Sequence, residues 1–110
     1  MPNLDLNNLF NSMVTAAKIS ASAGWSQIVS VATHEFQVIA HRIVQIGQAF
    51  ALGQIDKIDA QGLMKLAKNH IVAAIATLTT LVLATVQRII NAAMTAVRDV
   101  VNTAVGFVLL

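Results

Sequence analysis

Residues 51–63 read ALGQIDKIDAQGL, and this stretch separates two long apolar segments of the chain. Gly53 suits the left-handed position that follows the last turn of a helix. Asp56 can cap a following helix, and Asp59, three residues later, lies at the positive end of that helix's dipole. The stretch therefore predicts a turn at about residues 53–57 between two helices.

Helices are expected on both sides of this turn. Residues 63–105 contain neither Gly nor Pro, whereas a β-protein of that length needs several turns built from those residues. We expect one helix at about 25–52 and a long helix at about 58–108. Apolar residues at three- and four-residue spacing predict an N-terminal helical arm at about 5–23. The predicted fold class is all-α, as a single helical domain over residues 1–110.

The composition is strongly apolar for a chain of 110 residues, because 56% of them are hydrophobic and only 11% are charged. Average soluble domains have about 45–50% apolar and about 25% charged residues. Disorder is excluded, because it requires low hydrophobicity and many charges. The chain has no Cys, which excludes disulfides and cysteine-ligated metal sites. The apolar excess predicts that a partner covers part of the surface.

Polar residues form only narrow stripes on the predicted helices, which reverses the usual proportions of a surface helix. A continuous helix over residues 58–108 would be about 76 Å long, whereas a compact domain of this size has a radius of gyration of about 13 Å. The helix therefore either breaks near Thr79 and Thr80 or belongs to an elongated molecule. The polar pattern favours an elongated antiparallel helical hairpin with an N-terminal arm.

We expect this hairpin to pack into a helical oligomer or filament, as a non-enzymatic, self-assembling structural protein. The partner would be another copy of the chain. The expected interface combines apolar faces of the long helix with charged residues that set the register: Leu78, Leu81, Val82, Val86, Ile89, Ile90, Val97, Arg88, Arg98 and Asp99.

Membrane insertion is the first alternative. The longest run of the long helix without a charge or a His is residues 71–87, which is short of the roughly 20 apolar residues that a membrane span needs. A membrane-inserting or pore-forming oligomer, with its polar stripes lining a lumen, stays open as the second hypothesis.

A nucleic-acid coat is the third hypothesis. The net charge is only +2, but basic residues such as Arg88 and Arg98 would add up over many copies along a phosphate backbone.

The first ten residues, MPNLDLNNLF, lack the basic and apolar regions of a signal peptide. A cytoplasmic location is the default expectation, with membrane association left open.

The only candidates for a metal site are three histidines. His34 and His41 are seven residues apart and lie on one helix face, and antiparallel packing around the turn would set His41 beside His70. With Glu35 nearby, they could be ligands of zinc or another divalent ion. The Glu-x-x-His pair of di-iron bundles is absent, because Val38 stands three residues after Glu35. Solvated histidines explain the pattern better, so we expect no metal.

Catalysis finds little support in the sequence. There is no Gly-rich phosphate loop, no Cys nucleophile and no Gly-x-Ser-x-Gly motif. Capping of a helix accounts for the Asp56 and Asp59 pair. We therefore expect no enzymatic activity, no cofactor and no small-molecule substrate.

Overall fold

Four α-helices make up most of residues 4–110, the part of the chain that the computed structural model describes. They are α1 (Leu6–Ala21), α2 (Trp25–Ala51), α3 (Lys57–Leu78) and α4 (Leu83–Val105). A short 3-10 turn, Ser22–Gly24, joins α1 to α2, so helical residues follow one another without a gap up to the end of α2. No strand occurs in residues 4–110. The predicted all-α class is confirmed.

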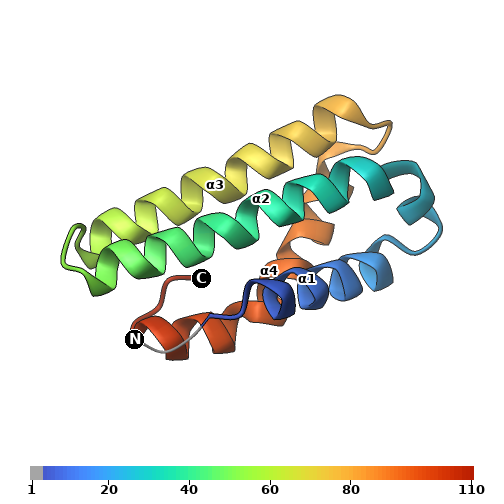
Figure 1. The fold of residues 1–110 in the computed structure, drawn as a ribbon. Helices are drawn as coiled ribbons and strands as arrows, with labels where there is room; N and C mark the ends of the chain where they lie inside the picture. The colour runs from blue at the N-terminus through green and yellow to red at the C-terminus, as the bar shows by residue number, and fades with distance from the viewer. Residues whose placement is uncertain (1–3) are drawn as a thin grey trace.

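The turn between α2 and α3 is built by local hydrogen bonds. Gly53 adopts a positive φ of 73°, which suits a residue without a side chain. The Asp56 side chain accepts a hydrogen bond from the Asp59 backbone N–H at 2.7 Å, and the Asp59 carboxylate accepts one from the Asp56 N–H at 3.3 Å. This capping box starts α3 in the direction that lets it run back along α2 (Figure 1).

The prediction of one continuous helix over residues 58–108 is wrong, because α3 and α4 are separate helices. The break begins at Thr79, whose backbone is extended. Its hydroxyl donates to the Ile75 carbonyl at 2.6 Å and accepts the Leu81 N–H at 3.4 Å. These bonds give the backbone an alternative to the helical pattern, so the chain turns without any Gly or Pro.

This break makes the molecule compact, and the elongated hairpin of the sequence-based expectation is therefore corrected. Helix α2 packs along α3 in one layer, and α1 packs on α4 in the other (Figure 1). The radius of gyration is 13.6 Å, against about 13 Å for a compact chain of this length. The accessible surface of 6173 Å² is close to the roughly 5,900 Å² of a compact monomer of this mass.

Apolar side chains from all four helices form one core between the two layers. The largest fully buried side chains are Phe36, Met13, Ile28, Ile39, Ile43, Ile71, Ile75, Ile89, Ile90, Val86, Val97 and Val101. The buried residues of α4 recur at three- and four-residue spacing, as expected of a helix with one apolar face. Much of the apolar excess in the sequence is therefore covered within one chain.

The chain beyond α4 folds back and connects both layers. The Asn102 side-chain oxygen accepts the backbone N–H groups of Leu109 and Leu110, each at 2.9 Å. The Gln61 side chain, near the start of α3, donates to the Val108 carbonyl at 2.8 Å. The C-terminal segment thus joins α4 to the α2–α3 pair, and Figure 1 shows it lying between them.

Candidate functional site

The ten residues predicted to form an interface fall into separate groups in the structure. Four are at most 2% exposed and pack in the core: Val86, Ile89, Ile90 and Val97. Leu81 is partly buried. Five are exposed: Leu78, Val82, Arg88, Arg98 and Asp99. The burial of the first group within one chain accounts for its apolar character without a second copy, and only the exposed residues lie where a partner can reach them.

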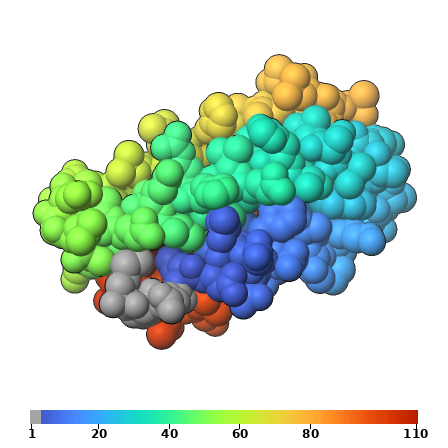
Figure 2. All heavy atoms as spheres, in the orientation of Figure 1, coloured from blue at the N-terminus to red at the C-terminus, as the bar shows by residue number. Residues whose placement is uncertain are grey.

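Three exposed apolar residues lie at the connection between α3 and α4. Leu78 ends α3, Val82 is the N-cap of α4 and Leu83 is its first residue. They are 66%, 67% and 53% exposed, respectively. We call this group the apolar corner, and in Figure 2 the segment around residue 80 protrudes from the upper right of the molecule.

The geometry of the connection explains why these side chains face the solvent. Leu81 turns inward, and its Cδ2 lies 3.6 Å from the place that a Cβ on Gly24 would occupy. The Thr80 hydroxyl donates to the Gln27 side chain at 3.1 Å, which ties the connection to the start of α2. Leu81 thus packs against the α1–α2 turn, while its neighbour Val82 stays exposed.

The apolar corner lies within an uncharged stretch of the chain. Residues 69–87 contain no Asp, Glu, Lys or Arg. Arg88 is exposed about 7.5 Å beyond Leu83 along α4, and Arg98 lies about 22 Å beyond it, so only Arg88 is near enough to influence a contact made at the corner. The corner itself is therefore uncharged, and Arg88 borders it on α4.

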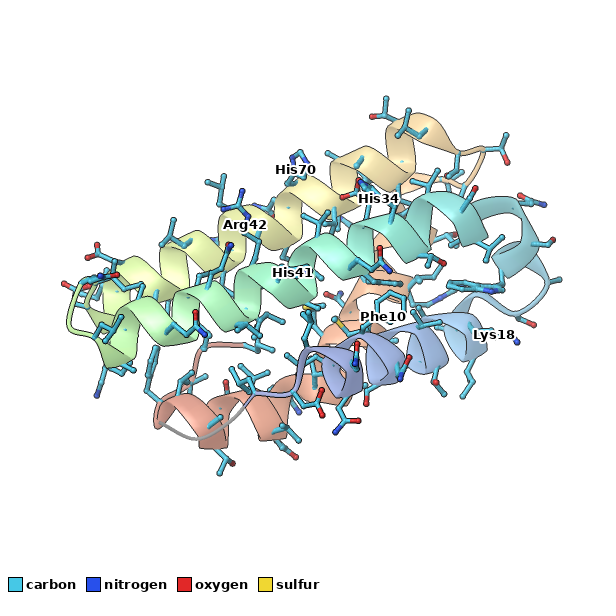
Figure 3. All side chains as sticks on the ribbon, in the orientation of Figure 1. Phe10, Lys18, His34, His41, Arg42 and His70 are labelled. Carbon is cyan, nitrogen blue, oxygen red and sulfur yellow. The ribbon has the colours of Figure 1, made fainter. Side chains whose placement is uncertain are left out.

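A second feature is a groove of about 560 Å³ between α2 and α3, which we call the α2–α3 groove. Its floor is buried and aliphatic, and polar side chains stand at its rim. The floor is formed by Ile39, Ile46 and Ile71, and the rim carries Arg42, Gln45 and His70. Figure 3 shows Arg42 and His70 on the same side of the α2–α3 pair. None of the lining residues is acidic.

The structure does not gather the three histidines into one site. His34 and His41 are exposed at separate points along α2, and His70 is exposed on α3 (Figure 3). His70 shares the groove with Val38 and Arg42, and not with His41 as the simple hairpin register predicts. Within residues 4–110, no three His, Cys, Asp or Glu side chains lie close enough to hold a metal ion.

Glu35 is a charged residue type in an apolar setting. The sequence indicates no role for it other than that of a possible metal ligand. Its side chain is 8% exposed, and its Oε2 atom has no hydrogen-bond partner. A buried carboxylate oxygen without a partner is unfavourable for stability. Glu35 does not line the α2–α3 groove, so it belongs to the packing between helices.

The sequence does not predict the groove, although part of its pattern is visible there. Val38, Arg42, Gln45 and Ala49 recur at three- and four-residue spacing, which places them on one face of α2. Which residues of α3 stand opposite them depends on the register of the two helices. That register is set by three-dimensional packing around the turn.

Comparisons with known proteins leave these two surfaces to be interpreted from their own residues. No family model matches the chain, and neither a curated protein nor a solved structure is detectably similar to it. Among the helices that the structure describes, none is both long and apolar enough to cross a membrane.

Proposed function

We propose that the protein is a non-enzymatic helical protein that self-associates through the apolar corner. The observation that carries the proposal is the exposure of Leu78, Val82 and Leu83 together in one short connection that contains no charge, whereas other exposed apolar side chains, such as Ile58, lie beside charged residues. Removing a fully exposed Leu or Val side chain from water contributes about 1.5–3 kcal/mol. Several such side chains from two copies reach the same order as the roughly 4–15 kcal/mol that association costs. We therefore expect a reversible, moderately weak assembly.

An isologous contact suits the chemistry of this surface. A two-fold interface places the same patch on both copies, and a charged patch would then face its own charge. The three side chains of the apolar corner carry no charge, and residues 69–87 contain none, so the corner does not place like charges opposite each other when it packs against itself. One isologous patch closes into a dimer, whereas a filament would need a further contact elsewhere on the chain. The dimer is thus the simplest assembly built from the corner.

The experiment is light scattering after size-exclusion chromatography over a range of protein concentrations. We expect the wild type to approach twice the monomer mass of 11.7 kDa as its concentration rises. The double variant Val82→Ser, Leu83→Ser should stay at the monomer mass. Circular dichroism of each variant verifies that the helices are intact.

Ile58→Ser is the matched control, because Ile58 is 78% exposed and lies at the opposite end of α3. This variant should associate like the wild type. A wild type that stays monomeric at high concentration would contradict the proposal. So would a loss of association in Ile58→Ser as large as that in the double variant.

A further inference from the structure

The α2–α3 groove has a polar end and an apolar end. Since α2 and α3 run antiparallel from their turn, higher residue numbers on α2 and lower numbers on α3 lie closer to the turn. His70 and Arg42 therefore stand toward the end away from the turn, where Val38 and Ile39 also line the groove. Ala49, Ile55 and Leu63 line the end next to it. The groove is thus amphipathic along its length.

The charge at the polar end selects an anion. Arg42 is exposed in the groove wall, and no acidic residue lines the groove to neutralise it. A guanidinium group presents parallel N–H donors that match a carboxylate, and the imidazole of His70 can add a further donor. A second copy docked here about a two-fold axis would bring Arg42 toward its own counterpart. An anionic ligand therefore fits this surface better than the chain itself does.

The aliphatic floor, which continues beneath both ends, and the apolar end of the groove select an alkyl chain. The floor residues Ile39, Ile46 and Ile71 are buried and held by the core, so the groove is preformed. Leu63 and Leu66 remain exposed beside it, and a chain lying in the groove would cover them. The volume of about 560 Å³ is within the roughly 300–1,000 Å³ of small-ligand sites.

We propose that the α2–α3 groove binds a free single-chain fatty acid, with its carboxylate at Arg42 and His70 and its alkyl chain directed toward the turn. This proposal does not depend on self-association, because the apolar corner contributes no residue to the groove. The variant Val82→Ser, Leu83→Ser should therefore bind the ligand as the wild type does. A failure of self-association would therefore leave fatty-acid binding testable, and a failure of fatty-acid binding would leave self-association testable.

Calorimetric titration with decanoate and dodecanoate, each below the concentration at which it forms micelles, tests the proposal. Each buried methylene raises affinity about fourfold, so dodecanoate should bind about 15-fold more tightly than decanoate. Decanol, which has the same chain length as decanoate and no charge, should bind more weakly than decanoate by about tenfold or more. NMR amide shifts should concentrate in the groove and leave residues 78–83 unchanged.

Two variants test the two ends of the groove. Arg42→Ala should weaken dodecanoate binding by about tenfold or more. Ala67→Phe should block the groove while Arg42 stays in place, because Ala67 lines it. Lys65→Ala is the control, because it removes an exposed cation from α3 that does not line the groove. Binding by Lys65→Ala should equal that of the wild type.

Several outcomes would overturn the proposal. One is equal binding of decanoate and decanol, which would indicate apolar adsorption without recognition of the carboxylate. A second is an equal loss in Lys65→Ala and Arg42→Ala, which would indicate attraction by overall charge. A third is binding only to phosphatidylglycerol vesicles, or only to an acidic amphipathic helical peptide, with no binding of free dodecanoate.

Discussion

The rings of Phe50 and Phe107 lie 4.7 Å apart between centroids, at an interplanar angle of 52°. Phe50 is in the last turn of α2, and Phe107 follows the end of α4. The Lys57 ammonium at the start of α3 lies 6.0 Å from the centre of the Phe107 ring. Through this one ring, the C-terminal segment touches both sides of the α2–α3 turn. The contact fixes the turn relative to the second layer of helices.

Replacing Phe107 should loosen this connection. Phe107→Ala removes the aromatic pair and part of the apolar burial, so we expect the free energy of unfolding to fall by about 1.5–3 kcal/mol. Urea unfolding followed by circular dichroism measures the change. Val108→Ala is the control, since Val108 is exposed, and it should shift stability by less than about 0.5 kcal/mol. Equal effects of the two substitutions would show that the ring contact contributes nothing.

Asn102 holds the same segment by hydrogen bonds, and its contribution can be separated chemically. Asn102→Ala should lower the free energy of unfolding by about 1–3 kcal/mol, because two backbone N–H groups lose their acceptor. Asn102→Asp keeps an acceptor oxygen and should retain most of the stability. Hydrogen exchange at Leu109 and Leu110 should accelerate in the alanine variant alone. Similar exchange in both variants would rule out this role of the side-chain oxygen.

Glu35 is expected to reduce the stability of the folded chain. Its Oε2 is buried without a hydrogen-bond partner, and such a group costs about 1–3 kcal/mol. Glu35→Leu should therefore raise the free energy of unfolding by an amount in that range, measured by urea or thermal unfolding. Glu35→Gln keeps a polar group in the same place and should change stability less. A Glu35→Leu protein less stable than the wild type would mean that the carboxylate is paired in solution.

The elements that the sequence predicts well are those defined by neighbouring residues. The start of α3 follows from Asp56 and Asp59, because both hydrogen bonds of the capping box join residues three apart. The sequence allows a break near Thr79, but the polar stripe that continues through this position favours an unbroken helix. Besides the hydrogen bonds of Thr79, the break is held by the packing of Leu81 against Gly24, two residues far apart along the chain. No local pattern in the sequence reports such a contact.

Contacts between residues far apart along the chain also decide which apolar residues are buried and which lie on the surface. Helical periodicity identifies an apolar face of α4 but does not say what covers it. Val86 is covered by its own chain, whereas Leu83, three residues earlier, is open to solvent. The α2–α3 groove likewise depends on which residues of α3 face Arg42, and that follows from the packed register. The class of fold was thus accessible from the sequence, and the division between core and surface was not.

Two glycines of different backbone geometry should respond oppositely to alanine. Gly24 has an ordinary helical φ of −74°, and an added Cβ would make only a van der Waals contact of 3.6 Å with Leu81. Gly24→Ala should therefore leave stability unchanged or raise it by about 0.4–1 kcal/mol. Gly106 has a φ of 85°, where a side chain is strained, so Gly106→Ala should cost about 1–2 kcal/mol. Thermal unfolding of the pair tests both values, and destabilisation by Gly24→Ala would indicate a tighter α1–α2 turn than the structure has.

Val86 and Leu83 provide the sharpest separation between folding and assembly. Val86 is fully buried, so Val86→Asp places a carboxylate in the core and should lower the free energy of unfolding by about 3–5 kcal/mol. Leu83 is exposed in the first turn of α4, where an acidic residue interacts favourably with the helix dipole. Leu83→Asp should therefore keep the helical circular dichroism of the wild type while abolishing self-association in light scattering.

If the apolar corner is the contact surface, Val86→Asp changes the folding of the chain, whereas Leu83→Asp changes only its self-association. Val86→Asp should lose its helical signal, or melt at a much lower temperature, at every protein concentration. Leu83→Asp should melt like the isolated wild-type monomer, because dilution and the substitution both remove the same contact. A folded Val86→Asp chain that merely fails to associate would place Val86 on the surface between copies. That result would restore the elongated hairpin and would contradict the compact arrangement of α3 and α4.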